Sequence, residues 1–257
     1  MLYQAAQYLK FLFRSTNQHG VHSPFVYHLV TQCFYDQKTY GAYSAILNYK
    51  KCLNSTPHKI KVTDLGAGSR INQQKTRAVT EIAKNAGSTY HRAKLLFRLT
   101  QYFKPQRVLE LGTSLGIATQ AMALGHPNAQ IISIEGCKNI SEFTTKLLKE
   151  QNIKNVSITT DSFFDAIQKL PLNQFDLIFF DGNHQKEATL QYFETLLDTA
   201  HNDSVFIFDD IYWSKGMTQA WQAIKAHPKV RVTIDTFFWG FVFFRKEQAK
   251  EHFSIRL

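Results

Sequence analysis

The pattern of apolar and polar residues divides the chain at about residue 106. From Arg107 onward, short apolar runs alternate with longer stretches in which apolar residues recur every three or four positions. The short runs are typical of buried strands, and the longer spacing is typical of helices that bury one face. Their alternation predicts an α/β domain in which helices cover a mostly parallel sheet.

Five strands are predicted in this region before the chain changes character. They cover residues 107–111, 130–135, 156–160, 175–181 and 204–210, and helices are predicted through about Leu124, around Phe143 to Leu148, and over 187–200 and 217–226. Two further apolar runs, 230–236 and 241–245, are separated by a connection too short for a crossover helix, so they must pair antiparallel. The predicted fold is a Rossmann-like, doubly wound sheet, mostly parallel, with an antiparallel C-terminal hairpin.

The first part of the chain lacks this alternation and predicts mainly helices and loops. Leu2, Ala6, Leu9 and Phe13 lie at helical spacing and indicate an amphipathic helix at the N-terminus. We therefore expect two domains: a basic, mainly helical N-terminal cap over residues 1–90, and an α/β domain over residues 91–257 that carries the candidate site.

Composition narrows the class of protein. Apolar residues make up 44% of the 257 residues and charged residues 19%, values that exclude wholesale disorder, collagen and coiled coil. No run of 18 or more apolar residues occurs, and the N-terminus lacks the order of a signal peptide. The three cysteines form no CxxC pair, which fits a reducing compartment. We expect a cytoplasmic protein.

The charge is concentrated in the first part of the chain. Residues 1–106 hold 15 basic and 3 acidic residues, whereas residues 107–257 hold 15 basic and 17 acidic residues. A basic field attracts phosphorylated or carboxylated small molecules, nucleic acid or a membrane surface. A solvated basic face with no partner is an equal alternative.

A glycine-containing turn follows the first predicted strand, with the sequence Gly112-Thr113-Ser114-Leu115-Gly116. Glycines at such a turn let the backbone bend sharply and approach a ligand. Glu135, which closes the next predicted strand, lies 23 residues after Gly112, close to the spacing at which an acidic residue accepts both ribose hydroxyls. The pair indicates a cofactor that contains adenosine.

Two alternatives compete for this turn. The same residues match the GxSxG nucleophile elbow of serine hydrolases, with Ser114 as the nucleophile. A hydrolase needs several strands before its elbow, however, and residues 1–106 supply few. A turn that binds nothing is the second alternative. Against it, acidic residues gather at or just past predicted strand ends: Glu110, Glu135, Asp161, Asp181, Asp209 and Asp210.

At this point the sequence resembles a known family. The segments RVLELGTSLG, ISIEG, FDLIFFDGNH and FIFDDIYW resemble the successive motifs of class I S-adenosylmethionine-dependent methyltransferases. Within that class, the likeness is to small-molecule O-methyltransferases of the catechol and caffeoyl-CoA type and of the sugar-modifying type. The resemblance covers about residues 90–245 and implies that S-adenosylmethionine is the cofactor.

The resemblance also implies roles for individual residues. Glu110, Gly112 and the turn would line the methionine end of the cofactor, Glu135 would hold the ribose diol, and Asp161 with Ser162 would lie at the adenine. The cofactor-binding residues expected are Glu110, Gly112, Thr113, Ser114, Glu135, Gly136, Asp161, Ser162 and Asp181.

Carboxylates at two strand ends suggest a divalent metal site. Asp181, Asp209 and Asp210 offer the hard oxygen ligands that Mg²⁺ prefers, although Asp209 and Asp210 could instead cap the following helix. We expect Asp181 and His184 to be catalytic, because an imidazole can take the proton of an acceptor hydroxyl. A surface histidine at a helix N-terminus is the alternative for His184. Trp213 would wall the acceptor site or simply pack.

A second glycine motif, Asp64 to Ser69, resembles a methyltransferase motif but lacks its context. The residues after it are polar, and no strand ending in an acidic residue follows at the right distance. A glycine turn is therefore favoured. The functional alternative is a mobile lid in which Arg70, Lys75 and Arg77 close over an anionic substrate.

The sequence thus predicts a methyltransferase acting on an oxygen of a small or anionic acceptor, with Mg²⁺ or a similar divalent cation as a candidate second cofactor. Three rivals stay open: an RNA methyltransferase, a serine hydrolase using Ser114, and a non-catalytic membrane-surface adaptor anchored by residues 1–14. Nucleic acid is not favoured, because no RNA-binding module is recognised. The sequence leaves the oligomeric state open, a homodimer included.

Overall fold

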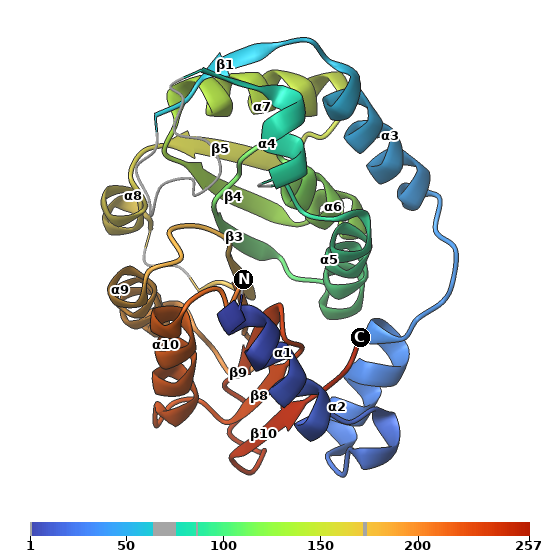
Figure 1. The fold of residues 1–257 in the computed structure, drawn as a ribbon, viewed down its shortest axis with the longest axis vertical. Helices are drawn as coiled ribbons and strands as arrows, with labels where there is room; N and C mark the ends of the chain where they lie inside the picture. The colour runs from blue at the N-terminus through green and yellow to red at the C-terminus, as the bar shows by residue number, and fades with distance from the viewer. Residues whose placement is uncertain (1, 64–75, 86, 172–173) are drawn as a thin grey trace. The chain divides into compact units, whose positions relative to one another are not determined.

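The structure, a computed structural model, describes the whole chain except residues 1, 64–75, 86 and 172–173 (Figure 1). Contacts divide the chain into two compact units. Unit 1 comprises Met1–Tyr35 and Lys169–Leu257, and unit 2 comprises Asp36–Gln168. The sequence analysis divided the chain by function instead, into a cap over residues 1–90 and an α/β domain over residues 91–257. That division stays a prediction.

Unit 2 contains three parallel strands with the helices that follow them. β3 (Arg107–Leu111), β4 (Gln130–Glu135) and β5 (Val156–Thr160) lie in the order β3-β4-β5, with Leu111 paired to Ile134 and Glu135 to Thr160. They alternate with α6 (Ile117–Gly125), α7 (Lys138–Glu150) and α8 (Phe163–Lys169). Because the strands are parallel and in register, the residues that follow each of them lie at one edge. The predicted strands and helices are confirmed here.

The rest of unit 2 is mainly helical, as the sequence predicts. α3 (Ala42–Ser55) and α5 (Tyr90–Phe103) pack on α6, and α4 (Val79–Asn85) packs on α3. A short antiparallel pair, β1 (Lys59–Lys61) and β2 (Thr76–Ala78), was not expected from the pattern.

Unit 1 holds the C-terminal strands in the order β10-β8-β9-β7-β6. These are β6 (Leu177–Phe180), β7 (Val205–Asp209), β8 (Val232–Asp235), β9 (Trp239–Phe243) and β10 (Glu251–Ser254). β6 and β7 are parallel, whereas β9 is antiparallel to both β7 and β8, so the predicted C-terminal hairpin is confirmed. β10 pairs parallel with β8 and was missed, because its four residues are polar or partly exposed.

Helices cover both faces of these strands. The remaining helical elements of unit 1 are α1 (Leu2–Arg14), η1 (Gln18–Gly20), α2 (Pro24–Leu29), η2 (Val30–Phe34), α9 (Lys186–Leu196), η3 (Leu197–Thr199) and α10 (Lys215–Ala226). On one face of β9, Phe241 contacts Phe34 of η2. On the other face, the ring of Trp221 from α10 lies so close to Gly240 that a Cβ there would be 2.7 Å from it. The fold is therefore the predicted doubly wound α/β type, with a mostly parallel sheet.

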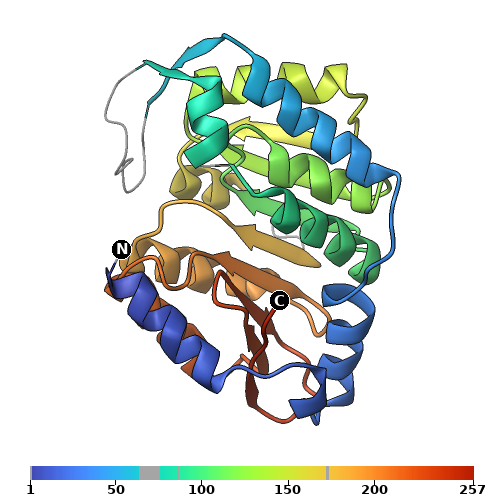
Figure 2. The same ribbon diagram turned by 45° about the vertical axis from the view of Figure 1, so that its right-hand side comes forward.

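The N-terminal helix forms where the sequence predicts it, but the expected apolar stripe is not its buried face. Leu2, Leu9 and Phe13 are 90%, 57% and 92% exposed, and Phe11 is the residue of α1 that is buried. α1 packs through Phe11 and Tyr8, whose rings contact Phe237, and Figure 2 shows it beside the C-terminal strands. The spacing of apolar residues therefore predicted the helix correctly but predicted the wrong face of it to be buried.

Among the residues that the structure describes, no helix combines the length and the hydropathy needed to cross a membrane.

Candidate active site

The glycine turn of unit 2 has a backbone that few residues can adopt. Gly112, Ser114 and Gly116 all have positive φ angles, of 110°, 47° and 71°. Two side chains hold the turn in place: the Thr144 hydroxyl donates to the Ser114 carbonyl oxygen at 2.7 Å, and the Tyr49 hydroxyl donates to that of Leu115 at 2.9 Å. Strained backbone that is held by its surroundings is typical of ligand-binding turns.

Glu135, at the end of β4, is fixed to this turn. Its Oε2 accepts a hydrogen bond from the Ser114 amide at 2.8 Å, and its Oε1 accepts one from the Cys137 amide at 2.9 Å. A carboxylate can accept about four hydrogen bonds, so these two orient the group and still permit it to accept ribose hydroxyls. This geometry fits the adenosine-containing cofactor that the sequence predicts.

Asp161 and Ser162 follow β5 at the same edge. The Asp161 amide donates to the Glu135 carbonyl oxygen at 3.2 Å, so the ends of β4 and β5 are joined there. The Ser162 hydroxyl bonds to Asp165 at 2.6 Å and accepts from the Asp165 amide at 3.1 Å, which caps α8. Ser162 thus has a local structural role that the sequence analysis did not assign.

Glu110 lies inside unit 2 and has no exposed surface. Its Oε2 accepts hydrogen bonds from the hydroxyls of Thr119 at 2.6 Å and Ser133 at 2.5 Å, and Ser133 in turn contacts Thr113 of the turn. Burial raises the pKa of Glu110 to about 7. The placement indicates that Glu110 positions the turn through this network, and direct contact with a cofactor would require a surface that it lacks here.

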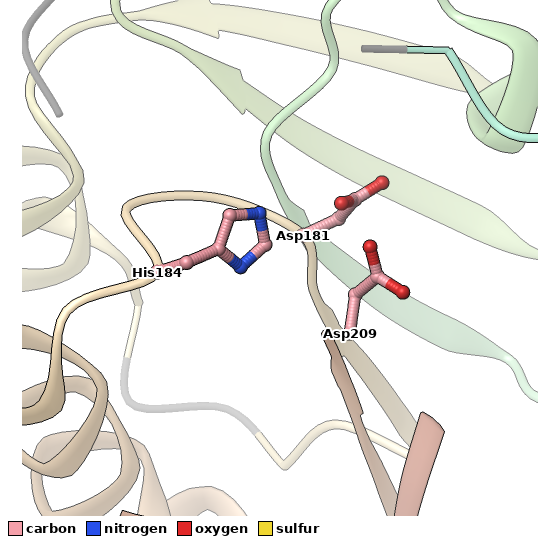
Figure 3. Close-up of side chains that lie close together, drawn as sticks. All are labelled: Asp181, His184 and Asp209. Carbon is pink, nitrogen blue, oxygen red and sulfur yellow. The ribbon is translucent and has the colours of Figure 1, made fainter. Parts of the chain in front are cut away.

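A second group of candidate residues lies in unit 1, at the ends of β6 and β7. Asp181, His184 and Asp209 each place one ligand atom so that all three lie within 4.8 Å of one another (Figure 3). The parallel pairing of β6 and β7 brings the two carboxylates to the same edge, and His184 comes from the loop after β6. Asp209 is buried. The structure therefore brings together three of the four residues predicted for catalysis or metal binding.

Asp210 is the fourth, and it is not part of this group. Its φ of 53° turns the chain after β7, and the residue lines a neighbouring pocket together with Trp213. The Trp213 ring centroid lies 6.4 Å from that of His184, and its role as a wall of the acceptor site stays a prediction.

Asn183 is a residue that the sequence analysis missed. It has a φ of 49°, its amide nitrogen donates to the Tyr192 hydroxyl at 3.1 Å, and its Oδ1 is buried with no hydrogen-bond partner among the described residues. It lies between Asp181 and His184 in the sequence. The Asp-Gly-Asn-His run was the signal available, because asparagine tolerates positive φ better than most residues.

The donor set of this group fits a divalent cation. Two carboxylates suit Mg²⁺ or Mn²⁺, and an imidazole ligand shifts the preference toward transition metals such as Mn²⁺. Two carboxylates held this close repel each other, and a cation between them removes that repulsion.

The second glycine motif, Asp64 to Ser69, lies outside the described residues, as do Arg70 and Lys75 of the suggested lid. Arg77 is described and belongs to β2. The lid stays a prediction of the sequence.

Comparison with known proteins matches the part of the chain that contains the candidate site residues. Residues 109–211 match the family model described as "Methyltransferase domain". This range begins in β3 and ends just after β7, so it contains the glycine turn, Glu135, Asp161 and the Asp181–His184–Asp209 group.

Solved methyltransferases share the fold at low sequence identity. The Podospora anserina methyltransferase PaMTH1, bound to S-adenosylhomocysteine, superposes with a TM-score of 0.62 at 13% identity, covering 87% of this chain and 97% of that one. The O-methyltransferase TomG from Streptomyces achromogenes, with S-adenosylmethionine, gives 0.57 at 16% identity over 80% and 91%. An O-methyltransferase from Bacillus cereus, with S-adenosylhomocysteine, gives 0.54 at 18% identity over 83% and 95%.

One relative of similarly low sequence identity is named for a different acceptor, a lysine. It is EEF1A lysine methyltransferase 2 from Danio rerio, 22% identical over 190 residues, which are 69% of this chain and 80% of the relative.

Residues 109–211 thus match a methyltransferase domain, and the chain has the fold of solved S-adenosylmethionine-dependent methyltransferases. The resemblance seen in the sequence is thereby confirmed, and so is the class of enzyme. The family match includes Ser114, so it favours a methyltransferase turn over the nucleophile elbow of a hydrolase.

Proposed function

We propose that this enzyme transfers the methyl group of S-adenosylmethionine to an oxygen atom of a small acceptor, with help from a divalent cation. The observation that carries the proposal is the convergence of Asp181, His184 and Asp209 within 4.8 Å of one another. The O-methyltransferases among the structural neighbours support the choice of oxygen as the acceptor atom.

In this proposal, unit 2 binds the cofactor. Glu135 accepts the two ribose hydroxyls, Asp161 lies toward the adenine, and the backbone from Gly112 to Gly116 approaches the methionine end. Gly136, the residue after Glu135, is also expected to contact the cofactor. Glu110 acts as a positioning residue through Ser133 and Thr113.

Methyl transfer forms a bond from the acceptor oxygen to the methyl carbon and breaks the bond from that carbon to sulfur. The acceptor hydroxyl must also lose its proton, and the product is S-adenosylhomocysteine. A divalent cation held by Asp181, Asp209 and His184 would supply Lewis-acid activation of that hydroxyl. Turnover that persists in the presence of a chelator would instead assign the proton transfer to the His184 imidazole as general base.

The first test is calorimetric titration with S-adenosylhomocysteine, which needs no knowledge of the acceptor. We expect micromolar binding that Glu135→Gln weakens by about tenfold or more, because a ribose diol loses a charged acceptor. Glu142→Gln is the matched control, since Glu142 lies on α7 with a mostly exposed side chain. Equal affinity of wild type and Glu135→Gln would refute the placement of the cofactor.

A lysine side chain of a protein is the second candidate acceptor, and the Danio rerio relative is the observation that favours it. The enzyme can be incubated with methyl-tritiated S-adenosylmethionine and a cell extract, which is then separated into small molecules, RNA and protein. Label in the small-molecule fraction supports the proposal. Label in protein supports lysine methylation, and label in RNA supports the basic N-terminal region as an RNA-binding surface.

A further inference from the structure

The N-terminal helix α1 turns an apolar side toward solvent. The exposed residues of this side, which we call the α1 stripe, are Leu2, Ala5, Ala6, Leu9, Leu12 and Phe13. They share one side because residues three, four, seven or eleven positions apart lie above one another on a helix. Leu2 and Phe13, at its two ends, are 90% and 92% exposed. Single exposed apolar residues are ordinary, but a continuous stripe marks an interaction surface.

Specific contacts on the other side of α1 hold the stripe outward. The Tyr3 hydroxyl donates to Thr218 Oγ1 of α10 at 2.7 Å, and Phe11 is 3% exposed. Arg14, at the end of the helix, forms an ion pair with Asp235 at 2.5 Å. A rotation of α1 that buried the stripe would break each of these contacts. The outward position of the stripe is therefore built into the fold of unit 1.

The charges close to the stripe in the sequence are positive. Residues 1–35 contain Lys10 and Arg14 and no acidic residue. Lys10 is exposed beside the stripe, and 41% of the Arg14 side chain is exposed although it is paired with Asp235. The chain as a whole carries a net charge of +10, so an anionic surface attracts it from a distance.

The size of the stripe argues against a second copy of the chain as its partner. A stable protein interface uses about 20–30 residues on each side, whereas the stripe has six. A bilayer surface needs no such area, because interfacial helices bind through one apolar face and through attraction to anionic lipids. α1 has 13 residues, or about 20 Å, less than the hydrocarbon core of about 30 Å, so it would lie along the interface.

We propose that the α1 stripe docks the enzyme on a bilayer that contains anionic phospholipid. Leu2, Leu9 and Phe13 enter the boundary between headgroups and acyl chains, and Lys10 lies at the lipid phosphates. From the sequence, residues 1–14 were considered as an anchor for a non-catalytic adaptor; here the helix carries a methyltransferase. The inference concerns where the enzyme works, and it does not depend on which acceptor the enzyme methylates.

Flotation of the full-length protein with vesicles tests the docking. One set of vesicles is phosphatidylcholine alone, and the other contains about one-third phosphatidylglycerol. We expect the anionic vesicles to bind the protein at least about tenfold more tightly than the neutral vesicles, and high salt to weaken this binding. Protein that floats with neither set would overturn the proposal.

A pair of substitutions assigns the binding to the stripe. Leu9→Gln combined with Phe13→Gln should lower the partition coefficient on anionic vesicles by about tenfold or more, because two exposed apolar side chains become polar. The matched control is Leu47→Gln combined with Phe164→Gln, which are exposed on α3 and α8 at 36% and 45%. Equal loss of binding in the two double variants would contradict docking through α1.

A charge substitution tests the role of Lys10. Lys10→Gln should weaken binding to the anionic vesicles about fivefold and leave binding to the neutral vesicles unchanged. Lys84→Gln removes an exposed lysine from α4 of unit 2 and is the control. If both variants lose the same affinity, the attraction comes from net charge alone, and the placement of Lys10 at the lipid is wrong.

A direct readout covers the case in which a double variant fails to fold, which thermal unfolding would reveal. Phe13→Trp places a fluorophore in the stripe, and vesicles whose lipids carry bromine on the acyl chains should quench its fluorescence beyond that of wild type. Equal quenching of the two proteins would show that Phe13 stays in water, against the proposal.

Sedimentation velocity without lipid tests for a second copy at the same surface. A wild-type dimer that Leu9→Gln with Phe13→Gln converts to a monomer would assign the stripe to self-association and overturn the proposal. A monomer in both, together with vesicle binding by wild type, supports it. The affinity for S-adenosylhomocysteine, measured on the same samples, tests the proposed function separately.

Discussion

Glu110 shows how one buried carboxyl can make stability depend on pH. The group is enclosed, its Oε2 accepts two hydroxyl hydrogen bonds, and its Oε1 has no hydrogen-bond partner among the described residues. Burial raises its pKa to about 7 from an ordinary value of 4.5. Folding therefore favours the protonated form, and its contribution to stability is present below pH 4.5 and lost as the pH rises to about 7.

The Glu110→Gln variant should remove this dependence, because the amide cannot ionise. Between pH 5 and pH 8, we expect the free energy of unfolding of the variant to rise relative to wild type by about 2–3 kcal/mol. Urea unfolding of both proteins across that range measures the difference, in which other titrating groups cancel. A difference that stays constant would show that Glu110 is already ionised at pH 5.

The prediction for Asp209 concerns the affinity for a divalent cation. Asp209→Asn should weaken Mn²⁺ binding by about tenfold or more, because a charged ligand becomes neutral, and it should leave affinity for S-adenosylhomocysteine unchanged. Calorimetric titration with MnCl₂ measures this directly. Asp198→Asn is the matched control, since Asp198 is an exposed aspartate that is paired with Lys229 and is not part of the group. If both variants bind Mn²⁺ like wild type, the metal site is refuted.

At the scale of elements, two features require a glycine at position 116, in the turn between β3 and α6. Gly116 has a φ of 71°, and a Cβ there would lie 2.6 Å from Thr144 Cγ2 and 3.1 Å from the Tyr49 hydroxyl. Left-handed backbone costs a residue with a Cβ about 1–2 kcal/mol, and the close approach adds to that cost.

Gly116→Ala should therefore lower the free energy of unfolding by about 2 kcal/mol or more and weaken binding of S-adenosylhomocysteine. Adding Thr144→Ser removes Cγ2 but keeps the hydroxyl, so the double variant should recover part of the loss. Gly41→Ala, where a Cβ meets nothing within 4 Å, is the control and should be nearly neutral. Equal stabilities of Gly116→Ala and Gly41→Ala would contradict the argument.

Strands β6 and β7 were predictable because their burial is complete. β6 and β7 are buried at every position, so their sequences are continuous apolar runs, and β3 to β5 have clear turn signals at their ends. β10 is half exposed and polar, and its place in the sheet depends on pairing with β8, which no local pattern encodes. For α1, the apolar stripe misled because Phe11, Tyr8 and Arg14 fix the helix through specific partners.

The residues of the candidate site likewise fall into those that a sequence pattern marks and those that none marks. Glu135 and Asp161 in unit 2, and Asp181 and Asp209 in unit 1, could be found because, within each unit, the ends of parallel strands meet at one edge. Asn183 was marked only by the Asp-Gly-Asn-His run, which permits a positive φ there, whereas the φ of 49° itself is a property of the folded chain. Arg14 and Asp235 meet across 221 positions of sequence, and no motif marks either of them.

At the scale of the whole molecule, the two units differ in charge. Residues 36–168 carry 18 lysines and arginines against 9 acidic residues, whereas the rest of the chain is almost neutral, with 12 against 11. The net charge of +10 therefore belongs almost entirely to unit 2. An anionic partner such as RNA would therefore be drawn to unit 2.

Within unit 1, Arg14 ties the N-terminal helix to the C-terminal strands. It bonds to the buried carboxylate of Asp235 and to the Tyr212 hydroxyl, and its guanidinium lies 5.5 Å from the centre of the Tyr212 ring. Arg14→Met keeps much of the apolar part of the side chain but removes the guanidinium that is paired with the buried Asp235 carboxylate. We expect the free energy of unfolding to fall by about 1–3 kcal/mol and hydrogen exchange of the α1 amides to become faster.

The same variant separates the roles of the two units. Because α1 belongs to unit 1, Arg14→Met should leave the affinity for S-adenosylhomocysteine, assigned to unit 2, within about twofold of wild type. Lys10→Met is the control, since Lys10 is an exposed cation on the same helix. Loss of cofactor binding in Arg14→Met, with Lys10→Met unchanged, would mean that the N-terminal helix supports the cofactor site, and the assignment of the cofactor to unit 2 would be wrong.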